Sequence, residues 1–275
     1  MMRLAIMQGR LSPPEENRIQ CFPRNSWSDE FPKAVEAGIP AIEWIDDTYG
    51  ADVNPLRTKE GVYELRNLME KHGVSIPSIC ADTFMEQPLV RCTDSEREER
   101  LELMKFLFTQ AKELGAKHLG IPLLDNSALK KHGEIETMAK TLQKMIPTLE
   151  KLKMELHIES SLSPKEFPEL LSKLNHPLIR VTYDTGNSAS LGFNPYEEFA
   201  AYGDRVGSVH IKDRKKGGGT VALGTGDTDF AAVKEELQKI RFQGLYTLQV
   251  ARGKDGNETE HLQRCKEFAD SVFSH

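Results

Sequence analysis

Short apolar segments alternate with amphipathic segments along the chain, and each apolar segment is followed by a helical pattern. The alternation repeats eight times, with expected strands at residues 3–7, 41–45, 75–81, 117–123, 154–158, 178–183, 206–211 and 245–250. Alternation of strand and helix predicts a parallel sheet, and eight units predict an α/β fold of the closed (β/α)8 TIM-barrel type. A doubly wound open sheet is the alternative. It usually has fewer units, and the glycine fingerprint that would follow its first strand is replaced here by QGRLSP.

Glycine, serine and proline mark the expected ends of several helices. Gly73 follows the helical pattern of residues 60–72, as expected for a helix that ends in a left-handed residue. Ser163, with Pro164 directly after it, predicts the start of the helix that follows the fifth strand. One continuous helix is expected over residues 133–151.

Length and charge restrict the classes of protein to which the chain can belong. The 275 residues suit one α/β barrel, so a single domain is expected over residues 1–275. The net charge of −6 at pH 7 would repel nucleic acid, so no nucleic-acid partner is expected. No run approaches the roughly 18 apolar residues of a membrane-spanning helix, and the apolar run at the N-terminus is too short for a signal peptide. The four cysteines show no CxxC pairing and are expected to be reduced. A soluble cytoplasmic protein without a membrane partner is therefore expected, with a homo-oligomer left open.

Polar side chains stand at or near the ends of the last four expected strands: Glu159, Asp184, His210 and Gln249. The carboxyl ends of parallel barrel strands meet at one face, where barrel enzymes build their active sites. Carboxylate oxygens, an imidazole and an amide oxygen together suit one divalent ion, such as Mn²⁺, Mg²⁺, Co²⁺ or Zn²⁺. The two carboxylates would also balance the charge of that ion. The pattern therefore predicts a metal site at this end of the barrel.

Some of these side chains also have structural interpretations. Glu159 and Asp184 could be buried carboxylates that pair with Arg180 or Lys212 instead of a metal. His157 lies one pleat deeper in the same strand as Glu159. We expect His157 in the core or behind a ligand, and not as a ligand itself.

Four short motifs resemble those of the xylose isomerase-like TIM barrels: IES at 158–160, YDTGN at 183–187, HIKD at 210–213 and LGTGDTDF at 223–230. More narrowly, they resemble the tagatose 3-epimerase and pentulose-5-phosphate 3-epimerase group. In that family a divalent metal is held by Glu, Asp, His and Glu at the ends of strands five to eight. The resemblance implies that Glu159, Asp184 and His210 are ligands and that Gln249 takes the place of the second glutamate. It also implies an isomerase or epimerase that acts on a small sugar or sugar phosphate.

Polar residues at other strand ends and in the adjoining loops are expected to contact the substrate: Gln8, Arg10, Glu43, Asp82, Asn187, Lys212 and Arg252. Phosphate sites in barrels often lie in the loops after strands seven and eight, where the cationic members of this set could meet a phosphate. The glycine-rich segment after the seventh strand is expected to be mobile and to become ordered over bound substrate.

Gln249 changes the chemistry that the family resemblance implies. An amide oxygen can ligate a metal, but an amide has no pKa near neutrality and cannot act as a base. Glu159 is then the metal-ligating base that moves a proton through a metal-stabilised enediolate. A same-face aldose–ketose isomerisation is favoured, unless Glu43 or Asp82 replaces the missing carboxylate.

Three other functions remain compatible with the motifs. A lyase of the inosose dehydratase type needs the same metal and enolate chemistry. A non-catalytic sugar-binding protein with a decayed site would explain Gln249. An enzyme of DNA repair resembling endonuclease IV is less compatible, because it needs three zinc ions and more histidine and acidic ligands than the strand ends supply.

Overall fold

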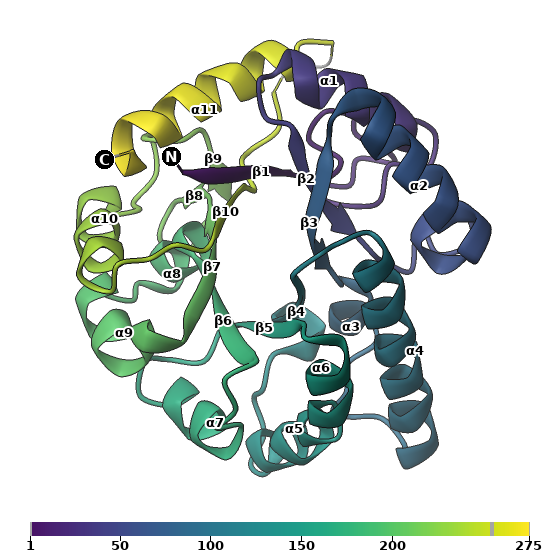
Figure 1. The fold of residues 1–275 in the computed structure, drawn as a ribbon. Coiled ribbons are helices and arrows are strands. Elements are labelled where there is room, and N and C mark those ends of the chain that lie inside the picture. The colour runs from purple at the N-terminus through teal and green to yellow at the C-terminus, as the bar shows by residue number, and fades with distance from the viewer. Residues whose placement is uncertain (1, 254–255, 275) are drawn as a thin grey trace.

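The computed structural model describes residues 2–253 and 256–274 and shows a closed barrel of eight parallel strands with helices around it (Figure 1). The strand order around the barrel is β1-β10-β7-β6-β5-β4-β3-β2. The eight strands are β1 (Arg3–Met7), β2 (Ala41–Ile45), β3 (Ser75–Cys80), β4 (His118–Leu123), β5 (Glu155–Ser160), β6 (Ile179–Asp184), β7 (Val206–Ile211) and β10 (Leu245–Leu248). The α/β TIM-barrel fold expected from the alternation is confirmed.

Helices connect successive strands on the outside of the barrel. They are α1 (Glu30–Glu36), α2 (Lys59–His72), α3 (Thr83–Glu86), α4 (Asp94–Glu113), α5 (Glu134–Gln143), α6 (Ile146–Leu152), α7 (Phe167–Lys173), α8 (Thr185–Leu191), α9 (Pro195–Tyr202), α10 (Phe230–Lys239) and α11 (Glu258–Phe273). Short 3-10 turns also occur in the described residues, at Trp27–Asp29, Pro55–Arg57, Asp125–Ser127 and Gly203–Arg205. Within the described ranges, no helix combines the length and the apolar character that a membrane crossing requires.

Two of the expected helix boundaries differ from the structure. The helix expected over residues 133–151 is divided into α5 and α6, because Pro147 lies in the first turn of α6 and cannot donate a backbone hydrogen bond into a continuing helix. Ser163 does not start α7, which begins at Phe167. Its hydroxyl donates to Glu166 at 2.6 Å, so the two residues close a turn before the helix. Gly73 does end α2, with a φ of +65°.

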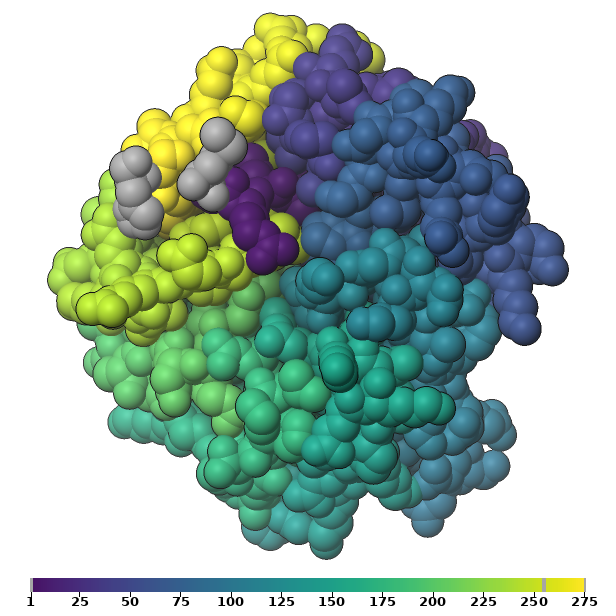
Figure 2. Space-filling view, in the orientation of Figure 1, coloured from purple at the N-terminus to yellow at the C-terminus, as the bar shows by residue number. Residues whose placement is uncertain are grey.

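The interior of the barrel near the amino-terminal ends of the strands is filled by polar and aromatic side chains. The rings of His118 and His157 stack with centroids 3.8 Å apart, and His157 Nδ1 lies 2.8 Å from Ser208 Oγ. The expected structural role of His157 is therefore confirmed. The space-filling view shows side chains across the centre of the ring that the ribbon leaves open (Figure 2). The barrel is thus a packed core rather than a pore, and its carboxyl-terminal face is left to build a site.

Candidate active site

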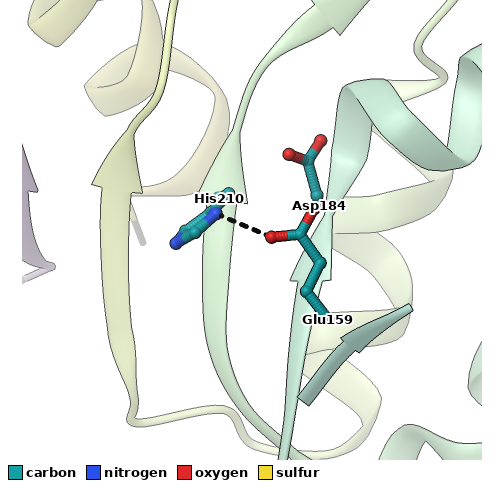
Figure 3. Close-up of side chains that lie close together, drawn as sticks. All are labelled: Glu159, Asp184 and His210. Carbon is teal, nitrogen blue, oxygen red and sulfur yellow. Dashed lines mark ion pairs between the residues drawn. The ribbon is translucent and has the colours of Figure 1, made fainter. Parts of the chain in front are cut away.

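Two acidic side chains and one histidine converge at the carboxyl ends of neighbouring strands (Figure 3). Glu159 lies in β5, Asp184 ends β6 and His210 lies in β7, where it is the register partner of Asp184. All three are buried, and one ligand atom from each lies within 4.8 Å of the others. His210 Nδ1 is 3.4 Å from Glu159 Oε2. The structure therefore brings together three of the four residues expected to hold a metal, in a cluster of the size that one ion needs.

The hydrogen bonds of the site leave ligand atoms unused. Among the described residues, the buried atoms Nδ1 of His210 and Oε1 of Gln249 have no hydrogen-bond partner. Gln249 Nε2 donates to Gln20 Oε1 at 2.9 Å, so the amide oxygen is its unused end. The second oxygen of Asp184 pairs with the ammonium of Lys212 at 2.9 Å, so the ion pair expected from the structural interpretation of Asp184 is present. A buried polar atom without a partner costs about 1–3 kcal/mol, and a cation ligated by His210 Nδ1 and Gln249 Oε1 would remove that cost. The donor set therefore fits a divalent ion.

Glu43 holds His210 from the side away from Glu159. His210 Nε2 lies 3.3 Å from a carboxylate oxygen of Glu43, whose other oxygen accepts a hydrogen bond from Thr247. Burial opposes the charged carboxylate, but the facing imidazole lowers the pKa of Glu43 to about 2. Burial likewise opposes the charged imidazole, but Glu43 and Glu159 raise the pKa of His210 to about 10. With the Nε2 proton directed at Glu43, Nδ1 is the nitrogen that would ligate an ion, and binding of the ion would have to release the proton that the raised pKa leaves on Nδ1.

We expect Glu43→Gln to weaken metal binding by roughly 10–100-fold, the range for groups that orient a ligating histidine. The substitution removes the charge that fixes the proton on Nε2 of His210, while it keeps the size of the side chain. Titration of chelated protein with Mn²⁺ measures the change. Glu64→Gln, on the exposed face of α2, is the matched control. Equal affinity in Glu43→Gln and wild type would show that Glu43 does not act through His210.

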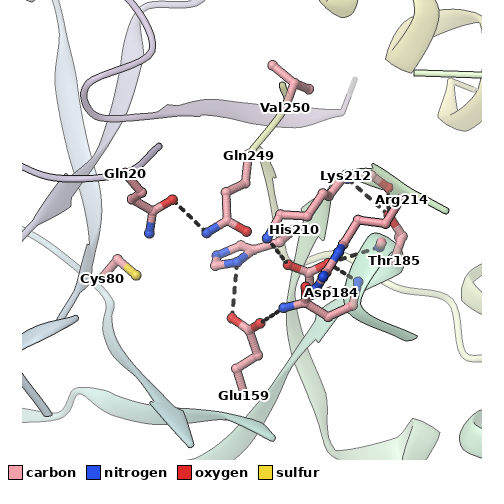
Figure 4. Close-up of polar contacts among 12 residues, drawn as sticks. Gln20, Cys80, Glu159, Asp184, Thr185, His210, Lys212, Arg214, Gln249 and Val250 are labelled. Atoms are coloured by element: carbon pink, nitrogen blue, oxygen red, sulfur yellow. Dashed lines mark hydrogen bonds and ion pairs between the residues drawn. The ribbon is translucent and has the colours of Figure 1, made fainter. Parts of the chain in front are cut away.

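Glu159 is oriented by a chain of hydrogen bonds that begins in the segment after β7 (Figure 4). Arg214 donates to the carbonyl of Gly218 and to Asn187 Oδ1 at 2.7 Å. Asn187 Nδ2 in turn donates to Glu159 Oε1 at 2.6 Å. Asn187 is placed by the N-terminus of α8, where Asp184 Oδ1 accepts from the Asn187 backbone N–H. One oxygen of Glu159 is therefore fixed, and the other faces His210.

The segment after β7 forms a small hairpin. β8 (Asp213–Arg214) pairs antiparallel with β9 (Thr220–Val221). Gly217, with a φ of +65°, makes the turn, and its N–H donates to the carbonyl of Ser190 at 2.8 Å. The glycine content predicted a mobile loop, whereas the structure shows a hydrogen-bonded hairpin tied to α8. Its ordering over substrate stays a prediction.

A cavity of about 420 Å³ opens at the carboxyl ends of the strands. Glu159 and Gln249 line it, together with four residues that were expected to contact substrate: Arg10, Asp82, Asn187 and Lys212. The structure therefore places these four expected residues around one pocket that is large enough for a small sugar ligand.

The other three expected substrate contacts do not line this cavity. Gln8 Oε1 accepts from the backbone N–H of Ile45 at 2.9 Å. Arg252 donates to three backbone carbonyls in the loop after β1. Glu43 contacts His210, as described above. These side chains support the walls of the site, and their direct contact with substrate stays a prediction.

Gln20 is a pocket residue that sequence reasoning missed. It lies in the long loop after β1 and reaches across to the ends of β3 and β10. Its Oε1 accepts from Gln249 and from Arg10 at 3.1 Å, and its Nε2 donates to Asp82 Oδ2 at 2.8 Å. The sequence carries no periodic signal for this contact, because the residue lies in an irregular loop.

A second hollow, of about 470 Å³, lies at the amino-terminal ends of the strands. Basic side chains are prominent in its lining, among them Arg3, Lys117, Arg180 and Arg241. The converging ligand atoms lie at the opposite end of the barrel, which is also where barrel enzymes place their chemistry. The smaller cavity is therefore the candidate active site.

Comparison with known proteins gives a consistent set of similarities. A family model described as "Xylose isomerase-like TIM barrel" matches residues 31–268. A putative L-ribulose-5-phosphate 3-epimerase from Shigella dysenteriae is 23% identical over 235 residues, which cover 82% of each chain. A zinc-bound structure of the IolI protein superposes with a TM-score of 0.79 at 17% identity and covers 99% of this chain and 98% of its own. D-psicose 3-epimerase from Clostridium cellulolyticum, solved with D-tagatose, gives a TM-score of 0.78 at 15% identity over 100% of both chains. The barrel fold is thus shared with both structures along nearly the whole chain.

Proposed function

Because the chain belongs to the xylose isomerase-like TIM barrel family, we propose that it is a divalent-metal-dependent isomerase or epimerase of a sugar or sugar phosphate. The observation that carries the proposal is the convergence of Glu159, Asp184 and His210 at one end of the barrel. The unpartnered oxygen of Gln249 would supply a fourth donor.

Each residue of the site has a role in this proposal. Asp184, His210, Gln249 and Glu159 would hold the ion, which when bound would polarise a carbonyl and the adjacent hydroxyl of a sugar. Glu159 would take the proton from the carbon beside the carbonyl, and the sugar would become an enediolate. Asn187 fixes the carboxylate of Glu159 for that transfer.

The names of the relatives favour a ketose or ketose phosphate as substrate. L-ribulose-5-phosphate 3-epimerase and D-psicose 3-epimerase are both named for inversion at one carbon of such a sugar. Lys212 and Arg10 line the pocket and are the cationic side chains that would meet a phosphate group there. A lyase of the inosose dehydratase type and a non-catalytic sugar-binding protein remain the rivals, and Gln249 is the feature that keeps the second one open.

A panel of free and phosphorylated ketoses, incubated with the Mn²⁺-loaded protein, tests the proposal. Chromatography of the products should show an isomer or epimer of at least one sugar, and chelation of the metal should abolish it. A dehydrated product would identify the lyase instead. Sugar binding by calorimetry without any conversion across the panel would identify the non-catalytic protein.

A further inference from the structure

The hollow at the amino-terminal ends of the strands takes no part in the proposed reaction, and its charge differs from that of the chain as a whole. The chain carries a net charge of −6. Among the described residues, however, the hollow is lined by two carboxylates and by five cationic side chains: Arg3, Lys117, Lys153, Arg180 and Arg241. An excess of three positive charges around one hollow of an acidic protein attracts anions to that place.

The five cationic side chains come from separate strand ends and not from one helix face. Arg3 is the first residue of β1, and Lys117 directly precedes β4. Lys153 lies just before β5, Arg180 is the second residue of β6, and Arg241 lies in the turn between α10 and β10. The amino ends of parallel barrel strands meet at one face. Residues from distant parts of the chain therefore surround a single opening.

Most of these cations have no partner in the protein. Arg180 donates to the carbonyl of Val206 at 2.9 Å. The side chains of the other four make no hydrogen bond or ion pair within the part of the chain that the structure describes. Of the two carboxylates, Glu155 has its Oε2 2.9 Å from His157 Nε2, and Asp204 lies in the exposed turn before β7. The hollow therefore presents unpaired positive charge to solvent.

Two of the cations occupy backbone positions that usually select glycine. Lys153 ends α6 and Arg241 follows the last residues of α10, each with a φ of +52°. A side chain in this left-handed region is strained, and helices that end there most often do so with glycine. Both residues are exposed, so burial of their side chains does not offset the strain. Their charge is the property that distinguishes them from glycine at these positions.

The buried part of the lining is polar and uncharged. His118 lies there, and burial together with the neighbouring His157 holds the pKa of His118 well below its ordinary value. Nε2 of His118 is a buried atom that finds no hydrogen-bond partner among the described residues. Apolar side chains complete the lining: Pro77, Leu178, Ile240 and Phe242. At about 470 Å³, the hollow has room for a small organic molecule and not only for an inorganic anion.

We propose that this hollow is a second ligand site, which binds a phosphorylated small organic molecule. The phosphate group meets the unpaired lysine and arginine side chains, because ammonium and guanidinium groups bind phosphate through charge-assisted hydrogen bonds. The carbon skeleton of the ligand lies against the apolar side chains, on the side of the hollow that His118 lines. The proposal does not rest on the proposed function, because neither a metal nor a reaction enters it.

Calorimetry of chelated protein at low ionic strength tests the site with D-glucitol 6-phosphate, D-glucitol and inorganic phosphate. D-glucitol 6-phosphate has no carbonyl group, so the cavity at the other end of the barrel cannot isomerise it. It should bind, inorganic phosphate should bind more weakly, and D-glucitol should not bind at the same concentration. The double variant Lys117→Gln, Arg241→Gln should raise the Kd of D-glucitol 6-phosphate by roughly tenfold or more, because charge-assisted hydrogen bonds are lost. The double variant Lys59→Gln, Arg66→Gln changes the same residue types on the exposed face of α2 and should bind as wild type.

Amide resonances locate the bound phosphate ester. Those of Gly207 and Gly244, which line the hollow, should shift on binding, whereas that of Gly186 reports on the start of α8 in the candidate active site. Shifts confined to Gly186, no binding to wild type, or equal affinity in wild type and the Lys117→Gln, Arg241→Gln variant would overturn the proposal. Inorganic phosphate that binds as tightly as D-glucitol 6-phosphate would overturn the assignment to an organic phosphate.

Discussion

Glu159→Gln is expected to lower kcat by roughly 10²–10⁴-fold, the usual contribution of a general acid–base group. Glutamine keeps an oxygen that can accept the hydrogen bond from Asn187 and can ligate an ion, but it cannot take a proton. The variant should therefore remain folded and should keep bound metal, so that only the proton transfer is lost. Steady-state kinetics, together with elemental analysis of the same sample, measures both properties.

Glu150→Gln provides the matched control for this substitution. Glu150 lies on α6, its side chain is 61% exposed, and its contact is with His176 on the surface of the barrel. Its kcat should equal that of wild type. A Glu159→Gln variant with metal and near wild-type kcat would show that another group removes the proton.

Asp184→Asn is expected to weaken metal binding by more than about 100-fold, beyond the range for residues that merely orient ligands. The substitution removes one of the negative charges that balance a divalent ion. It keeps an oxygen that can accept from the N–H groups of Gly186 and Asn187, which Asp184 caps at 2.9 and 2.8 Å. The start of α8 should therefore stay intact while the metal is lost.

Asp184→Ala separates these two roles of the side chain. It should lose the metal as Asp184→Asn does, and in addition lose about 0.5–2 kcal/mol of stability because the helix cap is gone. Elemental analysis and thermal unfolding of the two variants, both without metal, give the comparison. A full complement of tightly bound metal in Asp184→Asn would exclude this carboxylate as a ligand.

The strand ends that form the site could be predicted from the sequence because a barrel has one regular geometry. Once eight strand–helix units are recognised, the residue type at each strand end decides which side chains meet. Glu159, Asp184 and His210 follow from that rule, and the structure brings them together. The motif around Asp184 also predicted a strand end. It did not predict α8, the short helix that begins at the next residue.

The contacts that hold the side chains of the site in place could not be predicted, because they join segments that are far apart in the chain. Gln20 meets Gln249 across 229 residues and Glu43 meets His210 across 167 residues. Neither contact leaves a periodic pattern in the sequence, and the irregular loop that carries Gln20 has no regular geometry from which a direction could be inferred. The division of the helix at Pro147, in contrast, was visible in the sequence and could have been predicted from proline alone.

In the proposed function, residues at the ends of β5, β6, β7 and β10 would hold one divalent ion that polarises a sugar carbonyl, and Glu159 would move the proton on the adjacent carbon. Deuterium incorporation beside the carbonyl of a ketose, followed by mass spectrometry as Mn²⁺ is titrated into chelated protein, tests it most directly. The account predicts no incorporation without metal and a rate that rises until one ion is bound per chain. Incorporation that is independent of metal, or a metal-loaded protein that incorporates no deuterium into any sugar of the panel, would contradict it.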